Sequence, residues 1–286
     1  MPRRRVRFSL SSTMGYEFAS LVEKCAVAEA LGFEGIYTSD HMHGVAGVPA
    51  DTPFMEPWTL LAALAGYARK LRLGCLVSGV TYRHPSMLAK VAGTLDVLSG
   101  GRVDLGIGAS WSREDHVAYG IAFPELRERL ERLEEAVELI CGVWTHERFS
   151  FAGRHYQLHD APFAPRPVQV RAPILLAGAS PRLLRLTARR AQQWVSVSTA
   201  GFAGQCVRAV EAHCAQIGRD AREIEFAQSS ALLLCDSPSE VERVLAARTR
   251  PGATAQSAGG PVTDSRWRTV LHGHLSHQPQ ARHRRW

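Results

Sequence analysis

The chain has 286 residues, of which 45% are hydrophobic and 21% charged, as in an ordinary globular protein. Its length fits two average domains or one large barrel, and no apolar run approaches the roughly 20 residues of a membrane-spanning helix. The net charge of +7 comes from the two ends, because residues 1–7 and 251–286 each carry a surplus of four positive charges. We therefore exclude a membrane protein and expect neither a nucleic-acid nor a membrane partner.

The N-terminus and the cysteines both favour a cytoplasmic location. The basic start leads directly into an alternating strand pattern, without the apolar segment and cleavage site of a secretory signal. The six cysteines are scattered without C-x-x-C pairing and mostly lie in apolar segments. We expect buried free thiols rather than disulfides or a zinc site.

Short apolar runs alternate with helical patterns from the start of the chain. Phe18, Leu21 and Cys25 lie on one face at helical spacing, and Gly32 permits the left-handed conformation that ends such a helix. The runs between the helices are almost continuously apolar, as in a parallel sheet buried on both faces. This part of the sequence predicts strands over 6–12, 35–39, 71–77 and 103–107 and helices over 17–31, 57–69 and 85–98.

After Gly108 comes the longest excursion. A long amphipathic helix is predicted over 126–144, and a hairpin with its turn at Ala152-Gly153 follows over 149–158. Four prolines between 162 and 173 predict an extended connector, since proline cannot pair in a central strand. The alternation then resumes, with strands predicted over 174–177, 194–198 and 224–234 and helices over 181–192, 202–217 and 238–248.

No linker separates two composition blocks and no sequence repeat is visible, so we predict one domain over 1–250 with an insertion after the fourth strand. The strands so far number seven. Residues 251–286 have few β-branched residues and no apolar run and are rich in Arg, His, Pro and Gly. We interpret them as a disordered or non-native tail.

Ligands of parallel sheets and barrels bind at the carboxyl ends of the strands, where loops and helix N-termini converge. Asp40-His41 follows the second strand and is the best catalytic candidate, because histidine titrates near neutrality. A capped loop with a surface histidine explains the pair equally well. His43 makes an H-x-H pair with His41, but no third ligand has a suitable spacing, so we expect no metal.

Small residues follow the fourth and fifth strands. Gly178 and Ser180 before Pro181 are compatible with a phosphate at a helix N-terminus, although a simple turn with an N-cap accounts for them at least as well. Gly106-x-Gly108 lacks the third glycine of a dinucleotide-binding fingerprint, and Gly106 lies inside a strand. Trp58 and Trp111 are core aromatics or ring-stacking partners.

Several separated motifs together resemble the luciferase-like monooxygenase family, most closely its F420-dependent oxidoreductase branch. They extend over roughly residues 6–248. The motifs are 28–33 (AEALGF), 39–41 (SDH), 74–85 (GCLVSGVTYRHP), 88–90 (LAK), 95–96 (LD), 99–108 (SGGRVDLGIG), 167–169 (PVQ) and 173–178 (PILLAG).

The resemblance implies an α/β fold, a TIM-type (β/α)8 barrel that commonly dimerises. It also implies a flavin or deazaflavin ring against a bulge in the third strand, with a non-prolyl cis peptide at Cys75-Leu76. Since relatives continue into an eighth strand that we do not recognise here, we expect that strand to be missing or altered, which would leave unpaired edges. The residues implied to bind the cofactor are Asp40, Cys75, Leu76, Ser78, Gly108, Ala109, Gly178, Ala179 and Ser180.

The implied reaction is hydride transfer between coenzyme F420 and an unidentified small organic substrate, with His41 and Asp40 as the catalytic residues. Relatives that oxidise a sugar phosphate have a glutamate where Trp111 stands, so that substrate is disfavoured. Two alternatives remain: a monooxygenase that uses FMNH2 and oxygen, and a degenerate barrel that binds flavin without catalysis. A homodimer is implied by analogy alone.

Overall fold

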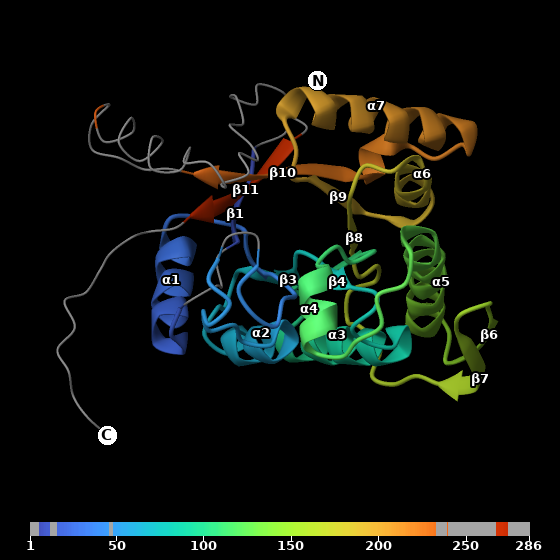
Figure 1. Ribbon diagram of the computed structural model, residues 1–286, viewed down its shortest axis with the longest axis horizontal. Coiled ribbons are helices and arrows are strands. Elements are labelled where there is room, and N and C mark those ends of the chain that lie inside the picture. The colour runs from blue at the N-terminus through green and yellow to red at the C-terminus, as the bar shows by residue number, and fades with distance from the viewer. Residues whose placement is uncertain (1–5, 12–15, 46–47, 233–238, 240–266, 274–286) are drawn as a thin grey trace.

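The computed structural model describes residues 6–11, 16–45, 48–232, 239 and 267–273. Its strands form one parallel sheet in the order β3-β2-β1-β11-β10-β9-β8-β5-β4, and a further pairing of β3 with β5 closes the sheet into a barrel. The helices lie outside the ring of strands (Figure 1). The barrel strands are β1 (Phe8–Ser11), β2 (Gly35–Thr38), β3 (Arg72–Cys75), β4 (Ser78–Gly79), β5 (Val103–Gly108), β8 (Ile174–Ala177), β9 (Gln193–Ser196), β10 (Glu225–Leu232) and β11 (Trp267–Gly273).

The helices follow the predicted alternation, and the insertion after the fourth barrel strand is confirmed. It contains α4, α5 and the antiparallel hairpin β6–β7, whose loop spans 153–156 rather than the predicted Ala152-Gly153 turn. A short helix, α4, was not predicted. The helices and the hairpin strands are α1 (Phe18–Ala30), α2 (Pro57–Ala65), α3 (Pro85–Ser99), α4 (Arg113–Ala118), α5 (Leu126–Thr145), β6 (Arg148–Ala152), β7 (Gln157–Pro162), α6 (Pro181–Arg190), α7 (Ala200–Gln216) and the 3-10 turn Ala221–Glu223.

The prediction that the eighth strand is missing is not confirmed. Strand β11 lies between β10 and β1 and pairs in parallel with both, with Val270 opposite Ser9 on one side and Ser229 on the other. Its place is set by backbone pairing with two neighbours, which its composition did not indicate. The barrel edges that we expected to be open are therefore joined. Residues 267–273 thus belong to the barrel and not to a disordered or non-native tail, whereas residues 251–266 and 274–286 lie outside the described residues.

The third strand of the barrel consists of two segments, β3 and β4. Residues 71–77 were predicted as one strand, but β3 ends at Cys75, still paired with Thr38, and the short β4 continues beside β5. The non-prolyl cis peptide is Leu76–Val77, one residue later than the predicted Cys75-Leu76. The register explains the difference, because Leu76 N still donates to Thr38 O at 2.7 Å and the chain leaves the ladder only beyond it.

The main core fills the layer between the barrel and its helices, with residues such as Leu61, Leu73 and Ile140 fully buried. A second, smaller cluster lies inside the barrel around Tyr37 and Val195. Gly106 permits the close approach of β3 and β5, because a Cβ there would come within 1.9 Å of Cys75 O. The five described cysteines are free, and four of them are buried, as predicted.

Polar groups close the amino end of the barrel. Asp104 is fully buried and accepts from Tyr37 Oη at 2.6 Å, from Arg72 Nη2 at 2.6 Å and from Gln193 Nε2 at 3.1 Å. Arg72 and Gln193 are the first residues of their strands. This end is filled by its own side chains, so the opposite rim is left for a ligand. None of the helices in the described part of the chain has both the length and the apolar composition that crossing a bilayer requires.

Candidate active site

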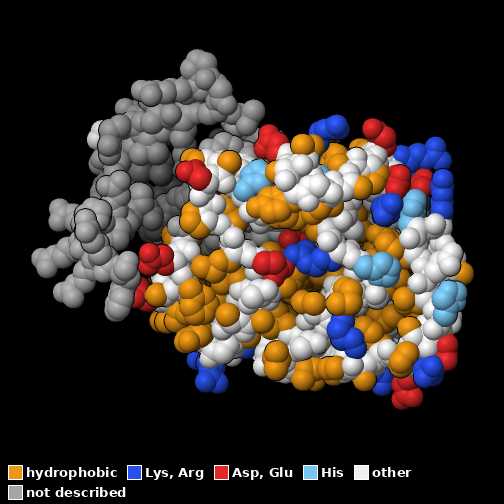
Figure 2. All heavy atoms as spheres, turned by 60° about the horizontal axis from the view of Figure 1, so that its bottom comes forward, with side chains coloured by type: hydrophobic (Ala, Val, Ile, Leu, Met, Phe, Trp, Pro, Cys, Tyr) orange, Lys and Arg blue, Asp and Glu red, His pale blue; other side chains and the backbone are white. Residues whose placement is uncertain are grey.

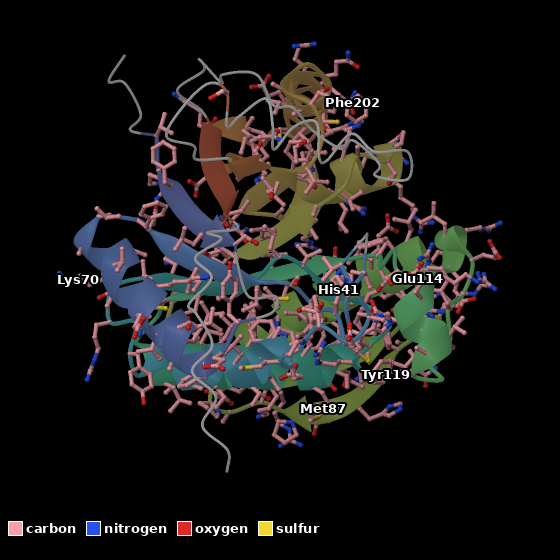
Figure 3. All side chains as sticks on the ribbon, turned by 60° about the vertical axis from the view of Figure 1, so that its left-hand side comes forward. His41, Lys70, Met87, Glu114, Tyr119 and Phe202 are labelled. Atoms are coloured by element: carbon pink, nitrogen blue, oxygen red, sulfur yellow. The ribbon has the colours of Figure 1, made fainter. Side chains whose placement is uncertain are left out.

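The predicted strand-end residues lie along one rim of the barrel. Thr38 pairs with Cys75, Ser78 with Ile107 and Ile107 with Leu176. The carboxyl ends of four neighbouring barrel strands, β2, β3–β4, β5 and β8, are therefore in register. The segments that follow them carry His41, Ala109 and Gly178 and therefore start from the same rim. Figure 3 shows His41 on the side of the rim where α4 carries Glu114 and is followed by Tyr119.

His41 is held by a carboxylate that we did not predict. Its Nδ1 lies 2.7 Å from Asp115 Oδ2, and Asp115 is fully buried on α4. A carboxylate without a proton only accepts, so Nδ1 carries the proton and Nε2 is left as the basic nitrogen of the neutral ring. Nε2 has no hydrogen-bond partner among the described residues, and the side chain is 13% exposed. His41 therefore presents a proton acceptor at the rim.

Asp115 joins the loop after β2 to the loop after β5. Besides His41, it accepts from Met42 N at 3.2 Å and from Tyr82 Oη at 3.1 Å. Burial by itself raises the pKa of Asp115, but hydrogen bonds from His41, Met42 N and the Ser112 hydroxyl outweigh burial and lower it below its ordinary value. Burial first, and then the charge of Asp115, raise the pKa of Tyr82, so its hydroxyl remains a donor.

Aromatic side chains surround the exposed edge of His41. Trp111 meets the His41 ring edge to face at 5.1 Å between centroids, and its side chain is 62% exposed. Phe54 meets the same ring at 6.5 Å. His43 stacks on Tyr119, and its Nε2 lies 3.5 Å from Asp115. Trp111 is thus a rim aromatic, whereas Trp58 is a core residue.

Asp40 makes no hydrogen bond to His41 within the described part of the chain but stabilises the break in the third barrel strand. Its Oδ2 accepts from Gly79 N at 3.1 Å and from Arg83 Nη1 at 2.7 Å, and its Oδ1 accepts from Arg83 Nη2 at 3.1 Å. Arg83 also pairs with Glu56 at 2.5 Å. These donors occupy a carboxylate that is only 6% exposed. A role for Asp40 in catalysis or in ring binding stays a prediction.

The side chains of Cys75 and Ser78 point into the layer of helices. Cys75 is fully buried in the main core, and Ser78 Oγ accepts from Trp58 Nε1 at 3.0 Å. Any contact from these two residues to a bound ring would come from their backbone. Leu76, by contrast, packs with Val77 against the cluster inside the barrel, so it belongs to the apolar floor beneath the rim.

Two helices begin at the same rim. Ser180 is the N-cap of α6, and its Oγ accepts from Leu183 N at 3.2 Å. Gly178 has φ +129°, a conformation open only to glycine, and Gly178 and Ala179 are exposed. Helix α7 begins after Thr199, whose side chain makes no cap bond. Gly108 ends β5 and is buried, whereas Ala109 is partly exposed.

These residues suit a flat, largely apolar ring with polar edges and an anionic tail. Leu76, Val77 and Ala177 offer an apolar floor, and the N-terminus of α6 offers a helix dipole that favours an anion. Two buried hydroxyls at the end of β2, Thr38 Oγ1 and Ser39 Oγ, have no partner among the described residues. A flavin or deazaflavin has this combination of an apolar body, polar edges and a phosphate.

The residues that sequence reasoning missed lie on or beside α4, which was too short to predict by periodicity. One local signal was available. Ser112 followed by Asp115 has the spacing of an N-cap and its third helical residue, and Ser112 Oγ does accept from Asp115 N at 3.3 Å. That signal would have placed Asp115 and His116 directly after the fourth barrel strand.

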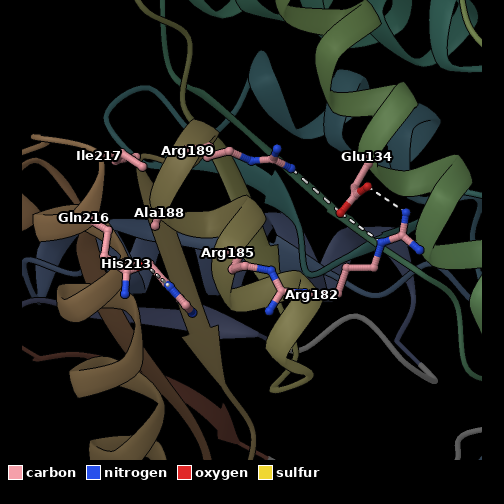
Figure 4. A pocket seen from close by; sticks show the side chains of 8 residues that line it. All are labelled: Glu134, Arg182, Arg185, Ala188, Arg189, His213, Gln216 and Ile217. Carbon is pink, nitrogen blue, oxygen red and sulfur yellow. Dashed lines mark hydrogen bonds and ion pairs between the residues drawn. The ribbon is translucent and has the colours of Figure 1, made fainter.

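Two surface hollows are not lined by His41, although one of them reaches Arg83, which pairs with Asp40. One, of about 230 Å³, lies between α5, α6 and α7 and is rich in arginine (Figure 4). Glu134 pairs with Arg182 at 2.8 Å and with Arg189 at 3.8 Å, so these charges are partly neutralised and hold α5 against α6. The other, of about 510 Å³, lies over α2 and α3. Neither is lined by His41, so we place the chemistry at the rim, where the buried polar groups converge.

Comparisons with known proteins found similar sequences and similar solved structures. Residues 6–284 match the family described as luciferase-like monooxygenase. The chain is 34% identical over 212 residues to an F420-dependent glucose-6-phosphate dehydrogenase of Intrasporangium calvum, covering 72% of this chain and 62% of that protein. It is 31% identical over 241 residues to a phthiodiolone/phenolphthiodiolone dimycocerosates ketoreductase of Mycobacterium tuberculosis, covering 77% and 62%. The chain therefore spans about three fifths of the length of these curated relatives.

Solved structures share the fold. An F420-dependent secondary alcohol dehydrogenase in complex with an F420-acetone adduct superposes with a TM-score of 0.72 at 18% identity, covering 79% of this chain and 69% of that one. The monooxygenase RslO1 from Streptomyces bottropensis superposes with a TM-score of 0.72 at 22% identity, covering 85% and 76%. At these identities the likeness concerns the fold alone.

Proposed function

Because the chain belongs to the luciferase-like monooxygenase family, we propose that it transfers a hydride between coenzyme F420 and a small organic substrate that bears a hydroxyl or carbonyl group. The observation that carries the proposal is His41, fixed by Asp115 through Nδ1, with Nε2 left without a hydrogen-bond partner among the described residues. The similarity to the F420-dependent dehydrogenase of Intrasporangium calvum supports the choice of F420.

Each residue of the rim has a defined part in this proposal. F420, when bound, accepts or delivers the hydride. His41 Nε2 takes the proton of the substrate hydroxyl as the carbon loses its hydride, and it returns that proton in the reverse direction. Asp115 holds the His41 ring in the tautomer that can do so and stabilises the charge that the ring gains. Trp111 and Phe54 meet the His41 ring edge to face and help to hold it in place.

The cofactor would be held by backbone and apolar groups rather than by charged side chains. Leu76 would contact the ring, with the backbone of Cys75 and Ser78 beside it. Gly108 and Ala109 would lie along the cofactor, and the start of α6, with Gly178, Ala179 and Ser180, would receive its phosphate. Asp40 would act through Arg83 and Gly79 N, which it holds at the edge of the ring site.

The test is a titration of the purified protein with F420 and, separately, with FMN. We expect F420 to bind with micromolar or better affinity and its absorbance to bleach when a substrate alcohol is added. Tight FMN binding, together with oxygen consumption by reduced flavin and indifference to F420, would instead establish a monooxygenase. Binding without turnover on any alcohol or carbonyl panel would indicate a non-catalytic barrel.

We also propose that two copies of the chain associate through the face formed by α2 and α3. Figure 2 shows hydrophobic side chains gathered over this face, which lies at the bottom of Figure 1. Met87 and Leu98 on α3 are 58% and 68% exposed, and the hollow of about 510 Å³ lies beside Leu98. An exposed apolar face of this kind is typical of an interface between protein chains.

A further inference from the structure

A chain of hydrogen bonds runs from the rim to a buried histidine that the proposed reaction does not use. Ser110 Oγ lies 2.7 Å from Thr81 Oγ1, and Thr81 Oγ1 lies 2.6 Å from His116 Nε2. His116 Nδ1 lies 2.6 Å from Ser112 O. Ser110 is partly exposed at the end of β5, whereas His116 is fully buried. The chain thus joins a hydroxyl at the site to an imidazole that water does not reach.

The direction of these hydrogen bonds follows from the carbonyl at the inner end. A carbonyl oxygen only accepts, so His116 Nδ1 carries a proton in either protonation state. In the neutral ring Nε2 then accepts from the Thr81 hydroxyl, and Thr81 in turn accepts from Ser110. Ser110 has used its single proton, so its oxygen can only accept from a further partner. A proton on His116 Nε2 would instead reverse the two bonds that involve Thr81 and leave Ser110 with a proton to donate.

The surroundings of His116 keep the ring in place. Its ring lies between Tyr82, with centroids 4.7 Å apart, and Phe123, at 4.6 Å. The charged groups packed around it are Asp115, which Tyr82 contacts through its hydroxyl, and Arg129, whose guanidinium lies 3.8 Å over the Phe123 ring.

The backbone holds Ser110 equally firmly. Ser110 has φ +61°, an unusual conformation for a residue with a side chain, and Arg129 Nη1 donates to its carbonyl at 2.9 Å. Its Oγ would lie only 2.5 Å from a Cβ placed on Gly79. The hydroxyl therefore lies directly against β4, the second segment of the third barrel strand. Glycine at position 79 leaves the space that this hydroxyl occupies.

We propose that Ser110 is a specificity-determining hydrogen-bond acceptor of the site, held in that polarity by Thr81 and His116. It would recognise an N–H or O–H group, either on the cofactor ring or on the substrate. The identity of these two ligands rests on the proposed function, but the polarity of the chain does not.

The first test compares Ser110→Ala with Thr81→Val, using Thr81→Ser as the matched control that keeps the hydroxyl. Loss of one neutral hydrogen bond predicts about 5-fold weaker binding for Ser110→Ala. The Thr81→Val change should weaken binding less, because the Ser110 hydroxyl remains but loses its orientation, and Thr81→Ser should match the wild type. The Kd of F420 without substrate reports a cofactor contact, and the KM of the substrate at saturating F420 reports a substrate contact.

The second test reads the tautomer directly. In 15N spectra of histidine-labelled protein, assigned by comparison with a His116→Gln variant, we expect His116 to be protonated at Nδ1, with the Nε2 signal moving in Thr81→Val. An Nε2-protonated ring would overturn the proposal, as would Ser110→Ala with unchanged Kd and KM. Failure of the proposed function would look different: wild-type protein would not bind F420, the titrations would then use FMN, and the tautomer would still decide the polarity.

Discussion

A single buried carboxylate, Asp115, decides how two histidines of one loop are presented. It faces His41 Nδ1 at 2.7 Å and His43 Nε2 at 3.5 Å, and only His41 keeps a nitrogen toward the open rim. The same loop therefore contains one residue suited to proton transfer and one suited to packing. This difference arises from geometry, since the two residues are chemically identical.

We predict that His41→Ala lowers kcat at least 100-fold and changes the Kd of F420 less than about 3-fold, because His41 moves a proton rather than binding the cofactor. Steady-state kinetics and fluorescence titration measure the two quantities. The control is His43→Ala, which removes the neighbouring ring beside the same carboxylate and should retain most turnover. Equal losses in both variants would show that the loop, and not His41, matters.

Replacement of Asp115 by asparagine should lower the free energy of unfolding by about 2 kcal/mol at neutral pH, since buried hydrogen bonds to a charged group are lost. In the folded protein the pKa of Asp115 lies below its ordinary value of 3.8. The stabilisation that the ionised Asp115 gives to the folded state is therefore complete above about pH 3.8, and it is lost as the pH falls through the lower pKa of the folded protein. Urea denaturation at several pH values should show the two proteins converging in acid. The exposed neighbour Glu114→Gln is the control and should follow the wild type.

At the level of elements, local signals located the starts of several helices but did not reveal the break in the third barrel strand. Ser180 before Pro181 was read correctly as a possible N-cap, because a cap depends on a few adjacent residues. Residues 71–77 were read as one strand because their apolar pattern continues across the break. The break itself depends on a contact distant in sequence, the bond from Gly79 N to Asp40.

The cap of α6 can be tested by Ser180→Ala, which should lower the free energy of unfolding by about 1 kcal/mol through loss of the bond from Leu183 N. The control is Ser180→Thr, which keeps a capping hydroxyl and should lose much less. If both variants unfold like the wild type, the Ser180 hydroxyl does not stabilise the helix as a cap. A role in binding the cofactor would then be favoured for this hydroxyl.

At the scale of the molecule, closure of the barrel depends on β11. We expect Val270→Pro, which removes a backbone donor from a strand paired on both sides, to cost about 3 kcal/mol or more and to broaden or abolish the cooperative unfolding transition. The control is Val270→Ala, so that the difference between the two variants isolates the backbone. Calorimetry would measure both, and indistinguishable unfolding would mean that β11 does not contribute to barrel stability.

The proposed interface between two copies can be tested by Leu98→Glu, which places a charge on the exposed apolar face of α3. We expect the molar mass in light scattering to fall from that of a dimer to that of a monomer, because a buried charge without a partner is costly. Val117→Glu, at an equally exposed apolar position on α4, should leave the mass unchanged. A wild-type monomer would refute the interface.

The sequence by itself determined the alternation of strands and helices, the insertion after the fourth barrel strand and the rim at which polar and small residues gather. These follow from periodicity and from residues adjacent in the chain. Only the tertiary structure decided that β11 closes the barrel, that Asp115 rather than Asp40 holds His41, and that Ser110 is tied to His116. Each of those depends on groups brought together across the fold, and pairing between distant segments leaves no period in the sequence that could reveal it.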